Sequence, residues 1–220
     1  MDWNTVVIVD ADDTRRNAIY RCLAPAGPAI PVARLGELGQ AWPQSAWFLV
    51  HDEATVLDTL YREFARRGVF YPIILFSEDL RPDRVVGAIH GGAMNYIAWP
   101  FDAARVRKAL RDVAEVARRR CEHASARMAA QDKISQLTAR ELEVVRAMRS
   151  GMTSKEIGRG LGISHRTVEI HRANAMAKLG AGNSAGIVTL LVEGEDGGPG
   201  ALYATEGPGG AAEPRRAARP

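Results

Sequence analysis

Short apolar runs alternate with amphipathic stretches over the first half of the chain. The runs are rich in β-branched and aromatic residues, which predicts buried strands at 5–9, 47–50, 73–76 and 95–98. Helical spacing of apolar residues predicts helices at 15–23, 54–67, 82–90 and from Asp102 onward. A further short strand is an option at 32–35, before a helix or loop at 37–42. Strands that alternate with helices predict a parallel sheet that is covered on both sides.

The pattern changes after about residue 135, where three short helical segments follow one another. Thr-x-x-Glu capping boxes start the first two segments, at positions 138 and 153. Glycines end the three segments, at positions 151, 162 and 180. Only Gly162-Ile163-Ser164 separates the second segment from the third, and a turn this short predicts a helix-turn-helix.

The third segment has two different faces. Val168, Ala175 and Leu179 share one side and are expected to pack on the other two helices. The opposite side is polar or small enough to approach the edges of DNA bases, and it comprises Arg166, Thr167, Glu169, Ile170, Ala173 and Asn174. His171 and Arg172 lie on the border between the two faces, where contact with phosphate is geometrically reasonable.

Charge follows this division of the chain. The 220 residues carry a net charge of only +3, whereas residues 133–192 hold nine Lys and Arg against four Glu, a net charge of +5. A local positive excess is what binding to the phosphate backbone requires. No apolar run is long enough to span a bilayer, so no membrane partner is expected. The cysteines, Cys22 and Cys121, have no metal-binding spacing and fit a reduced cytoplasm.

The segment from Leu137 to Leu179 closely resembles the DNA-binding domain of LuxR/FixJ-type regulators. The resemblance includes the opening T-x-R-E-x-E-V, the core S-x-x-T-V-E-x-H and the closing M-x-K-L. It implies double-stranded DNA as the partner, with base contacts from Glu169, Ile170 and Ala173. It also implies phosphate contacts, from Lys155, Arg166, Thr167, His171 and Lys178. A fourth helix at 184–192 would then serve dimerisation, through Ile187 and Leu191.

Polar side chains follow the predicted strands of the first half. In parallel sheets ligand chemistry gathers at the carboxyl ends of the strands, and these ends carry Asp10, Asp52, Ser77 and Trp99. This order resembles a two-component receiver domain, a flavodoxin-like α/β fold, over about residues 1–115. The resemblance makes Asp52 the candidate phospho-acceptor and Ser77 the hydroxyl that senses the phosphoryl group. It makes Tyr96 the aromatic residue that moves with Ser77, and it places a cis peptide before Pro100.

Three departures from the receiver pattern affect this expectation. Receivers carry two adjacent acids after the first strand, whereas this chain has Asp10-Ala11, so Asp12 or Asp13 would have to complete a magnesium site. The lysine that receivers place before Pro-Phe is Trp99 here, and the loop after Asp52 lacks the usual Met-Pro-x-x-x-Gly pattern. We therefore predict an atypical receiver with weak or no phosphorylation. No cofactor is expected, with Mg²⁺ a weak candidate at Asp10 and Asp52 in a pocket of Asp10, Asp12, Asp52, Ser77 and Trp99.

The predicted organisation is a receiver-like domain at 1–117, a helical linker at 118–134 and an all-α helix-turn-helix domain at 135–192. The Gly/Pro/Ala-rich tail at 193–220 is expected to be disordered. We predict a cytoplasmic DNA-binding transcriptional regulator without enzyme activity, controlled by homodimerisation that uses the aromatic area of Tyr96 and Trp99. Two alternatives stay open. One is an adaptor whose first domain captures a histidine kinase or another regulator, and the other is a working phospho-switch at Asp52.

Overall fold

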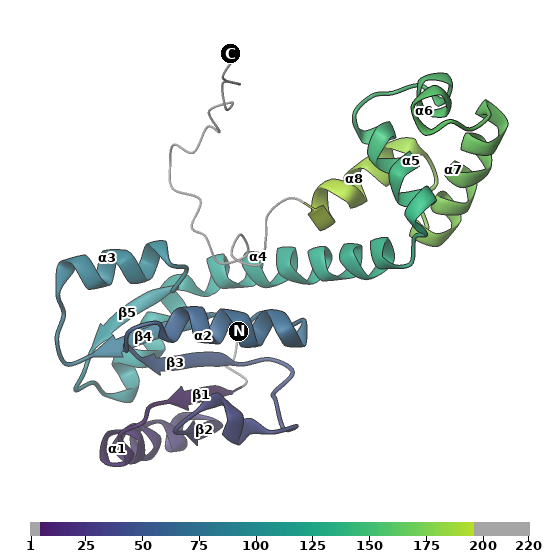
Figure 1. The fold of residues 1–220 in the computed structure, drawn as a ribbon. Coiled ribbons are helices and arrows are strands. Elements are labelled where there is room, and N and C mark those ends of the chain that lie inside the picture. The colour runs from purple at the N-terminus through teal and green to yellow at the C-terminus, as the bar shows by residue number, and fades with distance from the viewer. Residues whose placement is uncertain (1–4, 196–220) are drawn as a thin grey trace. The chain divides into compact units, whose positions relative to one another are not determined.

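The computed structural model of the protein describes residues 5–195, which are coloured in Figure 1. These residues form two compact units. Of the described residues, the first unit comprises 5–62 and 71–115 with the β-sheet, and the second comprises 63–70 and 116–195 with the last four helices.

The first unit is a five-stranded parallel sheet with strand order β2-β1-β3-β4-β5, the flavodoxin-like order. Its strands are β1 (Val6–Val9), β2 (Ala29–Val32), β3 (Trp47–His51), β4 (Ile73–Ser77) and β5 (Asn95–Ala98). Its helices are α1 (Asp13–Leu23), α2 (Val56–Arg67), α3 (Pro82–His90) and the first part of α4 (Ala103–Ser135), with short 3₁₀ helices η1 (Ala24–Ala26) and η2 (Leu35–Leu38). The predicted α/β fold class is confirmed.

Both faces of this sheet are buried, as a parallel sheet requires. Alternate strand residues and the inner sides of α1 and α4 form one core cluster, with Val6, Ile8, Leu49, Ile74, Phe76 and Ile97 from the strands and Ile19, Leu23, Val106 and Leu110 from the helices. Residues in between, such as Val7, Phe48 and Leu75, are also fully buried, and the alternation of side chains along a strand directs them to the opposite face. Helices α2 and α3 cover that face (Figure 1). This packing fixes the carboxyl ends of β1, β3 and β4 next to one another.

The second strand lies earlier than expected. The prediction placed it at 32–35, but β2 covers Ala29–Val32 and pairs with β1 from Val6↔Ala29 to Val9↔Val32. Pro31 is tolerated because β2 is an edge strand, where a missing N–H on the outer side leaves no ladder bond unmade. The segment expected as a helix or loop at 37–42 begins with η2.

The second unit contains α5 (Ala139–Arg149), α6 (Ser154–Leu161), α7 (His165–Leu179) and α8 (Ser184–Glu195). Both predicted capping boxes are present, with Thr138 and Thr153 as N-caps. A core of Val145, Ala175, Leu179, Ile187 and Leu191 joins α5, α7 and α8, and a smaller cluster of Val144, Ile157 and Val168 joins α5, α6 and α7. The all-α helix-turn-helix class is confirmed.

The predicted linker is helical, whereas most of the predicted tail lies outside the described residues. The unbroken α4 runs through 118–134, so this stretch is helical, as predicted. Residues 193–195 of the predicted tail belong to α8, and 196–220 lie outside the described residues. Within residues 5–195, no single helix has the length and apolarity to cross a bilayer; only α7 and α8 taken together do, and a 62° bend separates them.

Gly158 brings α6 and the turn after it into close contact. A Cβ built on Gly158 would lie 2.8 Å from the carbonyl oxygen of Ile163, whereas a Cβ on Gly160, two residues further along the same helix, meets nothing within 4 Å. The backbone of the turn cannot move away without disturbing the start of α7. The angle between α6 and α7 therefore depends on the missing side chain at position 158.

We expect Gly158→Ala to lower the free energy of unfolding of the second unit by about 1–3 kcal/mol, as overpacking does. The matched change Gly160→Ala should be neutral or stabilising by about 0.5–1 kcal/mol, because alanine restricts the unfolded chain and fits a helix. Chemical denaturation followed by circular dichroism measures both values. Equal effects from the two substitutions would contradict the close contact.

Candidate DNA-binding face and receiver-like pocket

The turn between α6 and α7 has the geometry of a helix-turn-helix. Gly162 ends α6 in the left-handed conformation with φ of 66°, which glycine adopts without strain. Ser164 caps α7, because its Oγ accepts a hydrogen bond from the N–H of Thr167 at 3.1 Å. The second helix of such a motif presents its N-terminal half to the major groove.

The outward face of α7 matches the predicted base-facing surface in part. Arg166, Ile170, Ala173 and Asn174 are exposed, and Ile170 keeps 52% of its surface accessible in spite of its apolar side chain. Lys155 on α6 is also exposed. It lines an open cavity of about 520 Å³ together with Arg159 and His165. The exposed apolar side chain of Ile170 suits contact with thymine methyl groups in a groove, and exposed basic side chains such as Arg166 and Lys155 suit the phosphates along its edges.

Several predicted DNA contacts have partners inside the protein. The hydroxyl of Thr167 lies 2.8 Å from that of Ser164. Arg172 donates from Nη2 to Ser184 Oγ at 2.6 Å, which ties α7 to the start of α8. Ser154 donates to Glu169 Oε1 at 2.6 Å, which ties α7 to α6. These groups therefore fix the position of α7, whatever they also do on DNA.

Lys178 has a structural role that the sequence did not indicate. Its Nζ lies 2.7 Å from Glu141 Oε2, and the same oxygen accepts the backbone N–H of Thr138 at 2.8 Å. The Glu141 side chain is only 5% exposed, and its pKa is held below the usual range by Lys178 and the amide at the α5 cap. Lys178 therefore has a partner inside the protein that offsets much of its charge, and its assignment as a phosphate contact stays a prediction.

The two residues of α8 that were predicted to contact a second copy, Ile187 and Leu191, are not at the surface. Ile187 and Leu191 are both fully buried and pack against α5 and α7, so they belong to the core of the unit. They hold α8 in place and are not available to a second protein. The accessible side of α8 carries Ala185, Thr189 and Val192, and a dimer through this helix would have to use those residues.

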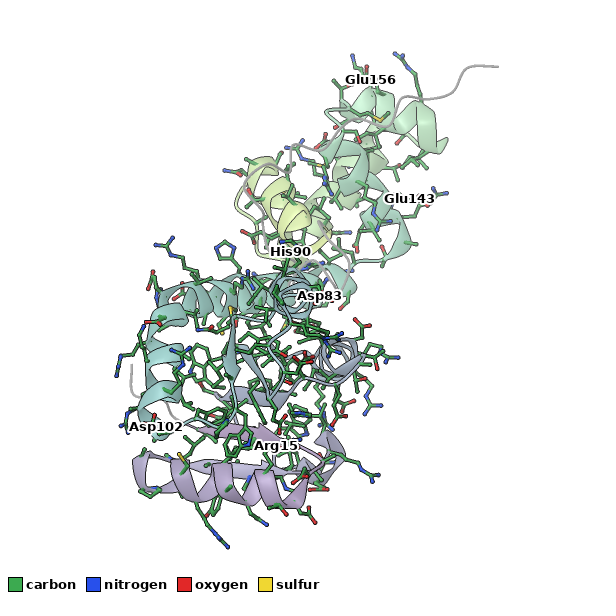
Figure 2. The ribbon with its side chains drawn as sticks, turned by 90° about the vertical axis from the view of Figure 1, so that its left-hand side faces the viewer. Arg15, Asp83, His90, Asp102, Glu143 and Glu156 are labelled. Carbon is green, nitrogen blue, oxygen red and sulfur yellow. The ribbon has the colours of Figure 1, made fainter. Side chains whose placement is uncertain are left out.

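In the first unit, the acid at the end of β1 is neutralised by an arginine. Asp10 is 2% exposed, and Arg15 binds both of its oxygens, Nε to Oδ2 at 2.6 Å and Nη2 to Oδ1 at 2.7 Å. Arg15 projects from α1 toward the sheet (Figure 2) and also donates from Nη1 to Glu78 at 2.6 Å. These bonds raise the pKa of Arg15 above its already high value, so the guanidinium stays charged.

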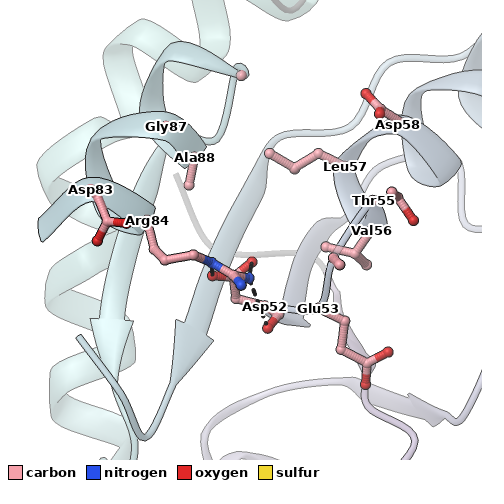
Figure 3. A pocket seen from close by; sticks show the side chains of 12 residues that line it. Asp52, Glu53, Thr55, Val56, Leu57, Asp58, Asp83, Arg84, Gly87 and Ala88 are labelled. Carbon is pink, nitrogen blue, oxygen red and sulfur yellow. Dashed lines mark hydrogen bonds and ion pairs between the residues drawn. The ribbon is translucent and has the colours of Figure 1, made fainter. Parts of the chain in front are cut away.

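A second arginine, Arg84, binds the side chain of the predicted phospho-acceptor, Asp52. Arg84 on α3 donates from Nε to Asp52 Oδ2 at 3.1 Å and places Nη2 2.8 Å from Oδ1 (Figure 3). The Tyr96 hydroxyl donates to Asp52 Oδ2 at 2.6 Å. Burial, with this bond to a carboxylate, raises the pKa of Tyr96 to about 12. Both oxygens of Asp52 are therefore engaged by side chains of the same unit.

The remaining pocket residues are arranged around these pairs. Ser77 Oγ accepts the backbone N–H of Asp79 at 3.2 Å, and Trp99 packs edge-on against Phe101 with ring centroids 4.9 Å apart. The peptide between Trp99 and Pro100 is cis, as the resemblance implied. Tyr96 is 9% exposed and directed to Asp52, so the expected aromatic dimer area does not include its ring.

The acidic residues do not fit a magnesium ion. Mg²⁺ requires free carboxylate oxygens in octahedral geometry. Both Asp10 oxygens are bound to Arg15, Asp12 caps α1 by accepting the N–H of Arg15 at 2.7 Å, and Asp13 pairs with Arg16. Among the described residues, no group of three or more His, Cys, Asp or Glu side chains could hold a metal ion. The arginines instead supply the positive charge.

Sequence reasoning did not predict the contacts of Arg15, Arg84 and Ser154, nor the ion pair that Glu141 forms with Lys178. Arg15 carried a weak signal, because it follows Asp10 by five residues at the start of a helix, within reach of the strand end. Arg84 and Ser154 carried none, because each meets its partner only after two elements pack together. The capping box did identify Glu141, but only as a cap and not as the partner of Lys178.

Comparisons with known proteins agree with this architecture. Residues 135–191 match the family model described as bacterial regulatory proteins, luxR family. The chain is 28% identical over 193 residues to the transcriptional regulatory protein FixJ of Azorhizobium caulinodans, which covers 85% of this chain and 91% of that protein. It is 29% identical over 195 residues to the C4-dicarboxylate transport transcriptional regulatory protein DctR of Rhodobacter capsulatus, covering 84% and 98%.

The fold has a counterpart among solved structures. The response regulator StyR superposes with a TM-score of 0.52 at 22% identity, over 86% of this chain and 98% of that one. The chain is therefore similar, over most of its length, to two proteins that are named as transcriptional regulatory proteins. Its C-terminal residues 135–191 are similar to the luxR family, and the chain shares its overall fold with a response regulator.

The Glu141–Lys178 pair leads to a pH-dependent prediction. Glu141→Gln should lower the free energy of unfolding of the second unit at pH 7 by about 1–2 kcal/mol, because a charged hydrogen bond is lost. The folded-state pKa of Glu141 is depressed, so its contribution is present above the unfolded value of about 4.3 and disappears as the pH falls through the folded value.

Denaturation of wild type and Glu141→Gln between pH 3 and pH 7 measures this difference. The two stability curves should run apart at neutral pH and converge below about pH 4. Glu143→Gln is the matched control, because Glu143 and Arg140 form a solvent-exposed ion pair on the same helix. A constant gap between the curves across the whole range would contradict the assigned role.

Proposed function

We propose that this protein binds double-stranded DNA as a homodimer in the cytoplasm, with α7 in the major groove, and acts there on transcription. The observation that carries the proposal is the exposed face of α7, with Arg166, Ile170 and Ala173 presented by a helix-turn-helix whose close turn depends on Gly158. The net charge of +5 over residues 133–192 supports contact with phosphate. The curated relatives named above are transcriptional regulatory proteins, which supports a role in regulation and not in catalysis.

We further propose that the receiver-like unit works without phosphorylation or magnesium. Phosphoryl transfer to a carboxylate needs a free oxygen on the acceptor and cations placed around the phosphoryl group. Asp52 has both oxygens bound by Arg84 and Tyr96, and Asp10 has both bound by Arg15. Control would then pass through dimerisation or through a protein partner that binds the unit.

Salt dependence tests the DNA-binding part. Affinity of the full chain for random-sequence duplex DNA should fall linearly on a log–log plot against salt concentration, because bound phosphates release counterions. Lys155→Ala should reduce the magnitude of that slope by about one, while Lys178→Ala should reduce it by less, because Glu141 already offsets its charge.

Fluorescence anisotropy over a range of salt concentrations gives the slopes. Lys108→Ala is the control, because Lys108 lies in the first unit and pairs with Asp112 at 2.7 Å. Its slope should equal that of wild type. A DNA affinity that does not change with salt concentration, or a Lys155→Ala slope equal to that of wild type, would count against α6 and α7 as the DNA-binding surface.

Intact mass tests the receiver-like unit. Incubation of wild type with Mg²⁺ and a small phosphodonor should add no phosphate, and Mg²⁺ should not change the melting temperature, because the cation sites are filled by Arg15 and Arg84. An ordinary receiver treated in parallel provides the positive control. A phosphate increment on wild type that is absent from Asp52→Asn would establish a phospho-switch and overturn this part of the proposal.

A further inference from the structure

Glu169 lies among the base-facing residues of α7, yet its carboxylate is already held by another helix. Ser154, the first residue of α6, donates from Oγ to Glu169 Oε1 at 2.6 Å. The Glu169 side chain is 43% exposed, so it is accessible from outside and fixed at one oxygen. A long side chain on a helix surface would otherwise sample several rotamers.

The charge of Glu169 is offset nearby. Arg172 Nη1 lies 3.6 Å from Oε2, and Arg172 Nη2 donates to Ser184 Oγ at 2.6 Å. Ser154, Glu169, Arg172 and Ser184 thus form one chain of contacts from α6 through α7 to α8. A carboxylate that approaches DNA is repelled by phosphates, and a neighbouring guanidinium reduces that repulsion.

Only one oxygen of Glu169 is left for recognition. Within the described part of the chain, Oε2 makes the 3.6 Å ion pair with Arg172 and no hydrogen bond. A carboxylate oxygen only accepts hydrogen bonds. In the major groove, cytosine offers the N4 amino group as a donor, and adenine offers its N6 amino group beside the acceptor N7, which repels a carboxylate; guanine offers only the acceptors O6 and N7, and thymine the acceptor O4. A fixed Oε2 would therefore attract cytosine and repel guanine.

We propose that Ser154 is a positioning residue for base recognition: it fixes Glu169 so that Oε2 selects cytosine at the base pair facing it. This inference rests on the proposed function, because it requires α7 to lie in the major groove. Ser154 touches no base in this scheme and acts only through Glu169. The selectivity comes both from the hydrogen bond to cytosine and from repulsion of bases that present acceptors.

The test is selection of the full chain on a pool of random-sequence duplex DNA, followed by sequencing to obtain relative affinities for each base at each position. Wild type should show one position with a cytosine preference in each half-site of the homodimer. Glu169→Gln should move that position toward adenine, because an amide pairs with both N6 and N7. Ser154→Ala should weaken the cytosine preference there by about three- to tenfold and leave the other positions unchanged.

Two further variants separate positioning from folding. Ser154→Thr keeps the hydroxyl and should restore most of the preference. Ser135→Ala removes a hydroxyl that bonds only to Asp132 O within its own helix, and its profile should equal that of wild type. Ser154→Ala should keep the wild-type melting temperature, because alanine suits a helix and the cap of α6 is Thr153. The double variant Ser154→Ala/Glu169→Gln should show no further loss beyond Glu169→Gln.

The possible results distinguish the inference from the function on which it rests. A Ser154→Ala profile identical to wild type, or one weakened equally at every position, would overturn the positioning role while DNA binding stands. A wild-type chain that enriches no sequence and shows no salt-dependent binding to the pool would overturn the proposed function itself. A loss confined to the position that Glu169→Gln also alters supports the inference.

Discussion

A carboxylate at the end of a buried strand has to be neutralised, and the receiver-like unit depends on how this is done. Asp10 is 2% exposed, and an unpaired charge at that depth would oppose folding strongly. Arg15 binds both of its oxygens, and Arg84 does the same for Asp52. A guanidinium is charged at every physiological pH and cannot leave as an ion can. The charge balance of the pocket is therefore built into the chain and does not vary with a bound cation.

The helical unit uses carboxylates in the same way, as fixed points between elements. Glu141 joins the cap of α5 to the end of α7, and Glu169 joins the start of α6 to the middle of α7. Gly158 then sets the distance at which α6 meets the turn. Together these contacts hold α7 at both ends, so its outward face is presented by a rigid frame. This rigidity is what recognition by a few side chains needs.

Features with a local cause could be predicted from the sequence, whereas those that depend on distant partners could not. The strands, the helices and both capping boxes follow from periodicity and from residues three or four positions apart. Arg84 meets Asp52 across 32 residues and Lys178 meets Glu141 across 37, and no pattern along the chain marks such pairs. Ala11 and Trp99, at positions where receivers carry an acid and a lysine, led to the prediction of an atypical pocket, but nothing along the chain indicated the arginines that pair with Asp10 and Asp52. It placed Ile187 and Leu191 in a dimer because apolarity alone does not distinguish core from interface.

The paired arginines also bear on how such a domain can evolve. A return to the ordinary receiver chemistry would require an acid in place of Ala11, a lysine in place of Trp99 and the loss of Arg15 and Arg84. Losing either arginine first strands a carboxylate without its counter-charge, and adding an acid first crowds negative charge around Asp10. Both of these steps lower stability before any function is regained. Under the function proposed above, phosphotransfer is therefore easier to lose from such a pocket than to regain.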